Sequence, residues 1–321
     1  MDEAGDERQA HSMADRPASA PEMPVPAPIG ESPIGGWTAR AGRAPPHLFF
    51  VVSAVFHYLG PAFAVLLFAR VEPLGVAWLR IASAALVFAL WRRPWHYFLG
   101  LSAADRRTVV ALGAVLAAMN PLFYLAIERL PLATVGAIEF LGPIGLAALG
   151  ARNVRNGLAL LLAVGGVWAL TDVRLEGELL GFLFAFANCA LFVVYIVLGH
   201  RIAGRGGSDG IDRLGAAMLV AAVLTLPFGL ADAAPAFLDP LLLAAAVGVG
   251  VSSSVIPYVC DQLAMARLPR PTFALLLALL PATATAIGVL VLRQVPSLPE
   301  VLGVALVVAG VAVHRPEDRR R

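Results

Sequence analysis

Residues 129–143 read RLPLATVGAIEFLGP, and the opening of this stretch returns later in the chain. Arg129-Leu130-Pro131-x-x-Thr134 recurs as Arg267-Leu268-Pro269-x-x-Thr272, 138 positions further on. The same offset aligns Pro143 with Pro281. A shared RLPxxT word followed by an aligned proline predicts that the chain contains two copies of one unit.

The composition places these copies in lipid. Of 321 residues, 59% are hydrophobic and 14% are charged, and the mean hydropathy is +0.78. A soluble domain carries about 25% charged residues because its surface faces water. The composition therefore predicts an all-α integral membrane protein, whose partner is the lipid bilayer.

Apolar stretches of the length that crosses a bilayer as a helix follow one another from His47 onward. We predict ten transmembrane helices from them. Their ranges are 47–68, 74–91, 107–127, 131–150, 156–171, 178–199, 212–231, 241–264, 271–292 and 298–314.

Arginine placement predicts how these helices are oriented. All 24 basic residues are Arg, and most lie in alternate loops and in the two tails, as Arg92, Arg152 and Arg205 do. The remaining loops carry acids such as Asp172 and Asp239. By the positive-inside rule both termini are cytoplasmic, which requires an even number of spans. The net charge of +2 gives no reason to expect a nucleic-acid partner.

The predicted organisation is two five-helix repeats between polar tails. The repeats are 47–171 and 178–314, and they are inverted because the two RLPxxT words fall in loops on opposite sides of the membrane. Residues 1–46, rich in Pro, Ala, Gly and mixed charge, are predicted to form a disordered cytoplasmic tail. Residues 315–321 are predicted to form a basic cytoplasmic tail. Inverted repeats of this kind are typical of transporters with a central site.

Polar side chains gather near the middle of the predicted spans. An ionisable group at that depth costs on the order of 2.5–3.5 kcal/mol, so it is a functional candidate. His57, Arg80 and Glu139 lie near the centres of the first, second and fourth spans. Asn120 and Asn188 lie in the third and sixth. The fifth and tenth spans have no central polar group and are predicted to be peripheral.

Alternatives stay open for most of these residues. Arg80 and Glu139 form a structural ion pair, or they bind the carboxylate and the ammonium of a zwitterion. Glu139 is also a candidate for a coupling proton, and His57 either titrates or serves as a neutral hydrogen-bonding group. The two asparagines bind substrate or only bridge helices. Asp261 is a gate or a proton site, or a charge that snorkels from the end of its helix.

The words NPLFYLAI at 120–127 and EFLGP at 139–143 resemble the EamA family of the drug/metabolite transporter superfamily. The closer resemblance is to its threonine/homoserine exporter subgroup. It implies a ten-helix, inverted-repeat exporter of amino acids, driven by a proton or substrate gradient, with Glu139 in the central cavity. The chain departs from the subgroup at His57, commonly glutamine, at Val65, commonly lysine, and at Leu280, where an acid before the proline is usual. Asp261 keeps an acid where the subgroup has Glu.

We therefore predict a secondary-active transporter in the cell membrane that exports threonine- or homoserine-like amino acids by alternating access. The alternatives are a channel and a membrane-embedded enzyme, but the sequence contains neither a recognisable filter nor a catalytic or metal-binding motif. No cofactor and no metal are expected, and a homodimer through Ala305 and Ala309 is compatible with the sequence. The predicted substrate-binding residues are Glu139, Arg80, His57, Asn120, Asn188 and Tyr124. The predicted coupling or gating residues are Glu139, Asp261, Pro143 and Pro281.

Overall fold

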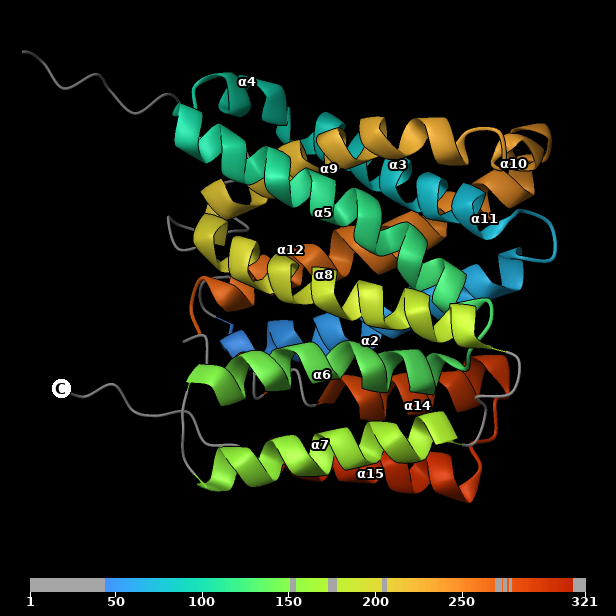
Figure 1. Cartoon of the computed structure of the whole chain (residues 1–321). Helices are drawn as coiled ribbons and strands as arrows, with labels where there is room; N and C mark the ends of the chain where they lie inside the picture. The colour runs from blue at the N-terminus through green and yellow to red at the C-terminus, as the bar shows by residue number, and fades with distance from the viewer. Residues whose placement is uncertain are drawn as a thin grey trace, which may run out of the picture. The chain divides into compact units, whose positions relative to one another are not determined.

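A computed structural model describes residues 44–150, 154–172, 178–203, 207–268 and 279–313, together with Phe273 and Leu276. Every regular element within these residues is helical (Figure 1), as predicted. The predicted tails fall outside the described residues, apart from 44–46. The disorder of residues 1–46 and the cytoplasmic placement of both tails therefore stay predictions.

The long helices follow the predicted ranges along the chain, and two short helices, α4 and α10, lie between predicted ranges. The eighth range contains three successive segments, because a π-helical turn, η1, separates α11 from α12. In chain order the elements are α2 (Pro46–Leu67), α3 (Pro73–Arg92), α4 (Pro94–Leu99), α5 (Ala103–Ile127), α6 (Leu132–Gly150), α7 (Val154–Asp172), α8 (Leu179–Ala203), α9 (Gly207–Gly229), α10 (Ala234–Leu238), α11 (Pro240–Gly250), η1 (Val251–Val255), α12 (Ile256–Met265), α14 (Leu279–Leu292) and α15 (Leu298–Val313).

Six helical stretches in the described residues are long and apolar enough to cross a membrane. They are Pro46–Leu67, Pro73–Arg92, Ala103–Ile127, Leu179–Ala203, Asp209–Gly229 and Pro240–Met265. The fourth, fifth, ninth and tenth predicted ranges contain shorter apolar helices: Leu132–Gly142, Gly157–Gly166, Leu280–Leu292 and Leu298–Gly310. The structure thus supports a protein that crosses the membrane several times, and the count of ten stays a prediction.

Prolines and a serine cap set where several helices begin. Helices α2, α3, α4, α10, α11 and α12 each carry Pro in the first two positions, where its fixed φ suits a helix and its missing N–H costs nothing. Helix α5 begins after Ser102, whose Oγ accepts a hydrogen bond from the Asp105 N–H at 3.2 Å. Helix α3 ends at Arg92, its C-cap Arg93 is left-handed with a φ of 47°, and Pro94 opens α4.

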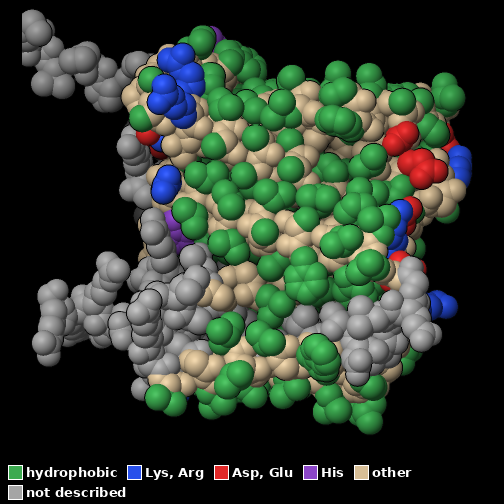
Figure 2. Space-filling model, viewed as in Figure 1, with side chains coloured by type: hydrophobic (Ala, Val, Ile, Leu, Met, Phe, Trp, Pro, Cys, Tyr) green, Lys and Arg blue, Asp and Glu red, His purple; other side chains and the backbone are tan. Residues whose placement is uncertain are grey.

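The surface and the interior are reversed relative to a soluble protein. Large apolar side chains face outward, with Leu90 75% and Leu290 77% exposed, whereas Arg80 and Glu139 are 3% and 2% exposed. Hydrophobic side chains cover the face seen in Figure 2, and most of its charged side chains lie at two opposite ends. Soluble proteins rarely expose so much contiguous apolar surface to water, so this surface faces lipid.

Helices far apart in the sequence pack in pairs. Helix α2 packs against η1 and α12, α5 against α8 and α9, and α3 against α9. Helix α6 packs against α7, α8 and α14. Helices α7 and α15 pack mainly against each other and lie at one edge of the described helices (Figure 1), the place predicted for the fifth and tenth spans.

Two glycines allow α2 and α3 to approach the π-helical turn closely. A Cβ at Gly60 would lie 2.7 Å from the Ser253 Cα, which is an overlap with backbone. A Cβ at Gly250 would lie 2.9 Å from the Arg80 carbonyl oxygen and would overlap the Ser83 hydroxyl. A side chain at either position would push the helices apart, so these glycines bring α2 and α3 against the segment that contacts Arg80.

Candidate functional site

A small polar cavity lies among six helices. About 10 Å³ of it is open to the centre of a water molecule, which is room for about one water. An amino acid would therefore have to open the cavity in order to enter it. The lining residues are His57, Pro61, Arg80, Met119, Asn120, Phe123, Glu139, Asn188 and Tyr258.

Arg80 is fixed in this wall by neutral groups. Its Nε donates to the Ser254 Oγ at 2.7 Å, and its Nη2 donates to the Ser253 carbonyl oxygen at 2.7 Å and to the Tyr258 hydroxyl at 3.5 Å. The guanidinium also lies over the Tyr124 ring, 5.5 Å from its centroid, an attractive arrangement for a cation.

The sequence explains why a carbonyl is available to Arg80. In an α-helix the N–H of residue 257 would bond the carbonyl of residue 253, but residue 257 is proline and has no N–H. The chain also forms a π-helical turn here, with the Ile256 N–H bonded to the Val251 carbonyl. Such turns are frequent at functional sites. The Ser253 carbonyl is thus left for the arginine.

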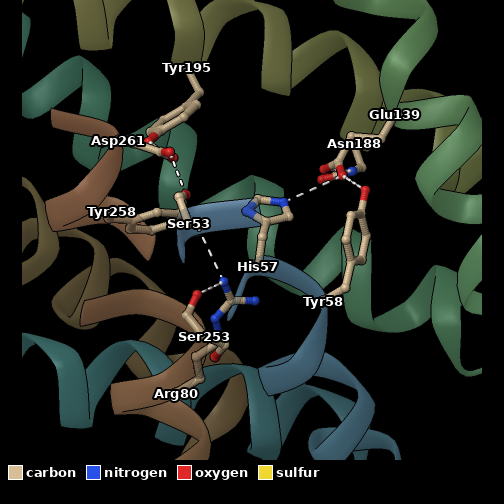
Figure 3. A network of polar contacts seen from close by, with 10 residues as sticks. All are labelled: Ser53, His57, Tyr58, Arg80, Glu139, Asn188, Tyr195, Ser253, Tyr258 and Asp261. Atoms are coloured by element: carbon tan, nitrogen blue, oxygen red, sulfur yellow. Dashed lines mark hydrogen bonds and ion pairs between the residues drawn. The ribbon is translucent and has the colours of Figure 1, made fainter. Parts of the chain in front are cut away.

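Glu139 is held by side chains from two helices (Figure 3). Its Oε2 accepts from the Tyr58 hydroxyl of α2 at 3.1 Å, and its Oε1 accepts from the Asn188 Nδ2 of α8 at 2.9 Å. The His57 Nε2 lies 3.6 Å from the same Oε2. Each carboxylate oxygen has two lone pairs, so Oε1 can still accept from a ligand.

Asn188 brings an unused acceptor to the cavity. Its side chain is fully buried, and its Oδ1 has no hydrogen-bond partner among the described residues. A buried acceptor left without a donor costs about 1–3 kcal/mol. A ligand that donates hydrogen bonds near Glu139 would remove that cost.

Arg80 and Glu139 line the same cavity without touching. Among the ion pairs of the described residues, none joins the two side chains within 4 Å. The direct structural pair that the sequence allowed is therefore absent from this structure. Arg80 is held by neutral groups and Glu139 by Tyr58, Asn188 and His57 instead, and both charges line the same cavity.

A second buried carboxylate lies close by. Asp261 of α12 accepts from the Ser53 Oγ at 2.5 Å and from the Tyr195 hydroxyl at 3.4 Å. It is 6% exposed, so it is not a charge that snorkels from the end of a helix. The rings of Tyr195 and Tyr258 lie beside it, with centroids 5.5 Å apart.

The Asp261 group lies on one side of His57 and the Glu139 group on the other (Figure 3). Ser53 is in the first half of α2, and Tyr195 and Asp261 are near the ends of α8 and α12. These are the helix ends predicted to face the cytoplasm. Asp261 therefore lies between the cavity and that end of the protein.

The structure brings together most of the predicted site. Glu139, Arg80, His57, Asn120 and Asn188 line the cavity, while Tyr124 contacts Arg80 without lining it. Pro281 is buried in α14, away from the cavity lining, and the side chain of Pro143 is outside the described residues. None of the α14 side chains that the structure describes lines the cavity.

Sequence reasoning missed the tyrosines and the apolar lining. Tyr58, Tyr195 and Tyr258 were not in the predicted set, because a tyrosine in an apolar helix is usually core. One available signal was Pro257, which leaves the carbonyl four residues before it without an intrahelical donor.

The fold and this cavity define a multi-pass helical membrane protein with a polar site among its helices. Residues 179–314 match the model of the EamA-like transporter family. The threonine/homoserine exporter RhtA of Salmonella typhimurium (strain LT2) is 30% identical over 253 residues, which is 78% of this chain and 84% of the relative. RhtA of Escherichia coli (strain K12) is 29% identical over the same length. The chain belongs to the EamA-like transporter family and is a membrane transporter.

A solved structure has the same fold. It is titled "Crystal structure of protein", has a TM-score of 0.58 and is 21% identical. The match covers 84% of this chain and 95% of the other.

Proposed function

We propose that this transporter exports small neutral amino acids, of the threonine and homoserine type, by alternating access. The observation that carries the proposal is the pair of opposite charges in one cavity that do not bond to each other. An α-amino acid has a carboxylate and an ammonium about two bonds apart. Its carboxylate binds Arg80 and its ammonium binds Glu139.

The surrounding groups suit this assignment. The ammonium has three donors and no acceptor, and it meets Glu139 Oε1 and the unused Asn188 Oδ1. The carboxylate meets a guanidinium already oriented by Ser254 and by the Ser253 carbonyl. Relatives named threonine/homoserine exporter support the same substrate class.

Packing supports two inverted five-helix repeats at 47–171 and 178–314. If α2 corresponds to α8, α5 to α12 and α6 to α14, the contacts occur in matching pairs. The pair α2 with α12 matches α8 with α5, and α2 with α14 matches α8 with α6. The pairs α3 with α9, α6 with α14 and α7 with α15 join corresponding helices. Exchange of conformation between such repeats gives alternating access.

The ends of the helices indicate which side is closed. At the arginine-rich end Arg92 bonds Asp212 through Nε at 2.7 Å and Nη2 at 2.8 Å, and both side chains are 13% exposed. Arg213 pairs with Asp105 at 3.3 Å at the same end. At the other end the Arg70–Asp239 pair is largely exposed. We therefore take the closed side to be the cytoplasmic one, with both termini cytoplasmic in the cell membrane.

Asp261 acts as the gate and coupling group in this proposal. Through Ser53 and Tyr195 it links α2, α8 and α12 between the cavity and the closed end. The groups that face it from the neighbouring helices are Ser53, His57 and Tyr195. A proton on Asp261 removes the negative charge that holds these hydroxyls and loosens the link. Glu139 binds the substrate ammonium or a proton, but not both.

Efflux from liposomes tests this proposal. The purified protein is reconstituted in liposomes loaded with labelled threonine, and efflux is followed with and without a pH gradient, beside Glu139→Gln. We expect saturable efflux and counterflow that the variant loses. If the folded wild-type protein moves neither threonine nor any other neutral amino acid, the proposed substrate class is wrong.

A further inference from the structure

Helix α5 provides most of the apolar wall of the cavity. Helices α2, α3 and α6 each contribute an ionisable side chain, namely His57, Arg80 and Glu139. Helix α5 contributes Met119, Asn120 and Phe123, none of which ionises. If Arg80 and Glu139 hold the amino-acid backbone, the wall of α5 is left for the substrate's side chain.

Two apolar groups of this wall are stacked on one face. Met119 and Phe123 are four residues apart, so they lie one above the other along the helix, and both are at most 5% exposed. With Pro61 of α2 they are the apolar side chains of the lining. Met119 is unbranched and can change rotamer to make room. The Phe123 ring is rigid and lies next to the Tyr124 ring, with centroids 6.1 Å apart, so Phe123 sets the limit on size.

The third residue, Asn120, offers a hydrogen bond to this space. Its Nδ2 donates to the Leu116 carbonyl oxygen at 2.8 Å, and the side chain is 2% exposed. The Tyr258 hydroxyl also interacts with this amide. The amide nitrogen is held by α5 itself, and the amide oxygen has two lone pairs, so the oxygen can still accept from a ligand. A ligand hydroxyl buried against Met119 and Phe123 needs such an acceptor, since an unpaired buried hydroxyl is costly.

We infer that Met119, Asn120 and Phe123 determine which amino acids are transported. Met119 and Phe123 restrict the substrate's side chain to a few non-hydrogen atoms, and Asn120 favours a side chain with a hydroxyl. The site then selects small hydroxylated amino acids over larger aliphatic or aromatic ones of equal charge. This inference rests on the proposed function and adds the specificity-determining residues to it.

Competition in counterflow tests the size limit. Unlabelled threonine, leucine and phenylalanine compete with labelled threonine for uptake into threonine-loaded liposomes, with wild type, Phe123→Ala, Phe123→Leu and Met119→Ala. In Phe123→Ala we expect the apparent affinity for leucine relative to threonine to rise by about tenfold, because one methylene in an apolar pocket changes selectivity by about 10–200-fold. Met119→Ala should raise the relative affinity for leucine by a smaller factor. Phe123→Leu is the milder variant if the alanine variant does not fold.

Threonine and valine test the role of Asn120, because they have the same shape and differ by a hydroxyl. In Asn120→Leu the preference for threonine over valine should fall by about threefold to tenfold, the range set by one neutral hydrogen bond. Phe63→Ala is the control matched to Phe123→Ala, since Phe63 is on α2, is 44% exposed and does not line the cavity. It should keep the wild-type order of amino acids.

The outcomes separate the two levels of the proposal. Folded variants that still transport threonine and keep the wild-type order of amino acids would overturn the inference and leave the exporter function standing. A wild-type protein that transports no amino acid would overturn both. A changed order in Phe63→Ala as well would show that selectivity follows general loosening of the helices, which also contradicts the inference.

Discussion

Glu139 of α6 and Asp261 of α12 are two buried carboxylates held by the same pair of helices, α2 and α8. Each accepts one hydrogen bond from α2 and one from α8: Glu139 from Tyr58 and Asn188, and Asp261 from Ser53 and Tyr195. The difference lies in what remains around them. Glu139 lines the cavity beside an amide oxygen without a partner, whereas Asp261 is outside the lining and beside aromatic rings.

This difference indicates different roles for similar groups. A carboxylate next to space and an unused acceptor is suited to bind a ligand that enters and leaves. A carboxylate bonded to two helices without adjoining space is suited to hold those helices together. On this account removal of the first charge affects binding, and removal of the second affects movement.

Glu139→Gln should give the largest effect. It keeps the shape of the side chain and removes the charge that faces the substrate ammonium, which costs about 2–5 kcal/mol when one partner of a buried charge pair is lost. Threonine affinity, measured by calorimetry on the purified protein, should therefore fall by at least about 30-fold. Glu128→Gln is the matched control and should bind as wild type, because Glu128 lies beyond α5 and is exposed. An unchanged affinity in Glu139→Gln would remove Glu139 from the site.

Arg80→Lys should give the next largest effect. It tests the positive charge of the cavity, as Glu139→Gln tests the negative one. Lysine keeps the charge, but it lacks the fork that bonds both the Ser253 carbonyl and Ser254. The loss of directed hydrogen bonds to a charged group costs about 1.5–3 kcal/mol. Threonine affinity should fall by about 10–100-fold. Lysine that binds as well as arginine would show that only the charge matters.

Asp261→Asn separates binding from movement. Asparagine is neutral and cannot accept from both Ser53 and Tyr195 as a carboxylate does. Threonine affinity should stay within about threefold of wild type, since no hydrogen bond to the ligand is lost. A pH gradient should no longer stimulate efflux by this variant, while counterflow, which needs no gradient, should continue. An affinity that falls as far as in Glu139→Gln would end the distinction between the two carboxylates.

Comparison with the sequence shows which parts of this site could be predicted. The cost of burying charge in a membrane identified Arg80, Glu139 and His57 without any structure. It could not show that Arg80 bonds a backbone carbonyl, because that bond depends on a π-helical turn. It also could not identify Tyr58 or Tyr195, since their hydroxyls reach carboxylates only through the rotation of α2 and α8.

For the fold too, the sequence predicted local features but not long-range contacts. Hydropathy located the long helices, because apolar length is written locally in the chain, but it did not locate the short helices α4 and α10. Asp261 was placed near a helix end in sequence, and its burial came from neighbours more than 60 residues away, Ser53 and Tyr195. Contacts of that separation leave no local pattern.

Gly60→Ala tests the packing that supports the Arg80 side of the comparison. The added Cβ overlaps the backbone at Ser253, and overpacking of this kind costs about 1–3 kcal/mol. The melting temperature in detergent should fall, and threonine affinity should weaken because the turn beside Arg80 shifts. Gly248→Ala is the control, since a Cβ there has no neighbour within 4 Å. Equal stability of both variants would show that the close approach is not required.

Asp239→Asn should have the smallest effect, because this carboxylate lies outside the spans. Hydrogen bonds from the Leu242 and Leu241 N–H groups and from Arg70 lower its pKa from the ordinary value of 3.8. A lowered pKa contributes stability that is present above 3.8 and is lost as the pH falls through the folded value. The variant should melt slightly below wild type at neutral pH, with the difference vanishing in acid. A difference that grows on acidification would contradict this sign.

The most direct test pairs each charge with the ligand group that it is proposed to bind. Calorimetry on the purified protein compares threonine with threoninol, which lacks the carboxylate, and with 2,3-dihydroxybutyrate, which lacks the ammonium, in wild type, Arg80→Gln and Glu139→Gln. We predict that wild type loses at least about 30-fold in affinity when either ligand group is removed. Arg80→Gln should no longer distinguish threonine from threoninol, and Glu139→Gln should no longer distinguish threonine from dihydroxybutyrate, as expected for groups in contact. If each variant weakens all three ligands by the same factor, the two charges do not bind the two ends of the substrate, and the central claim is wrong.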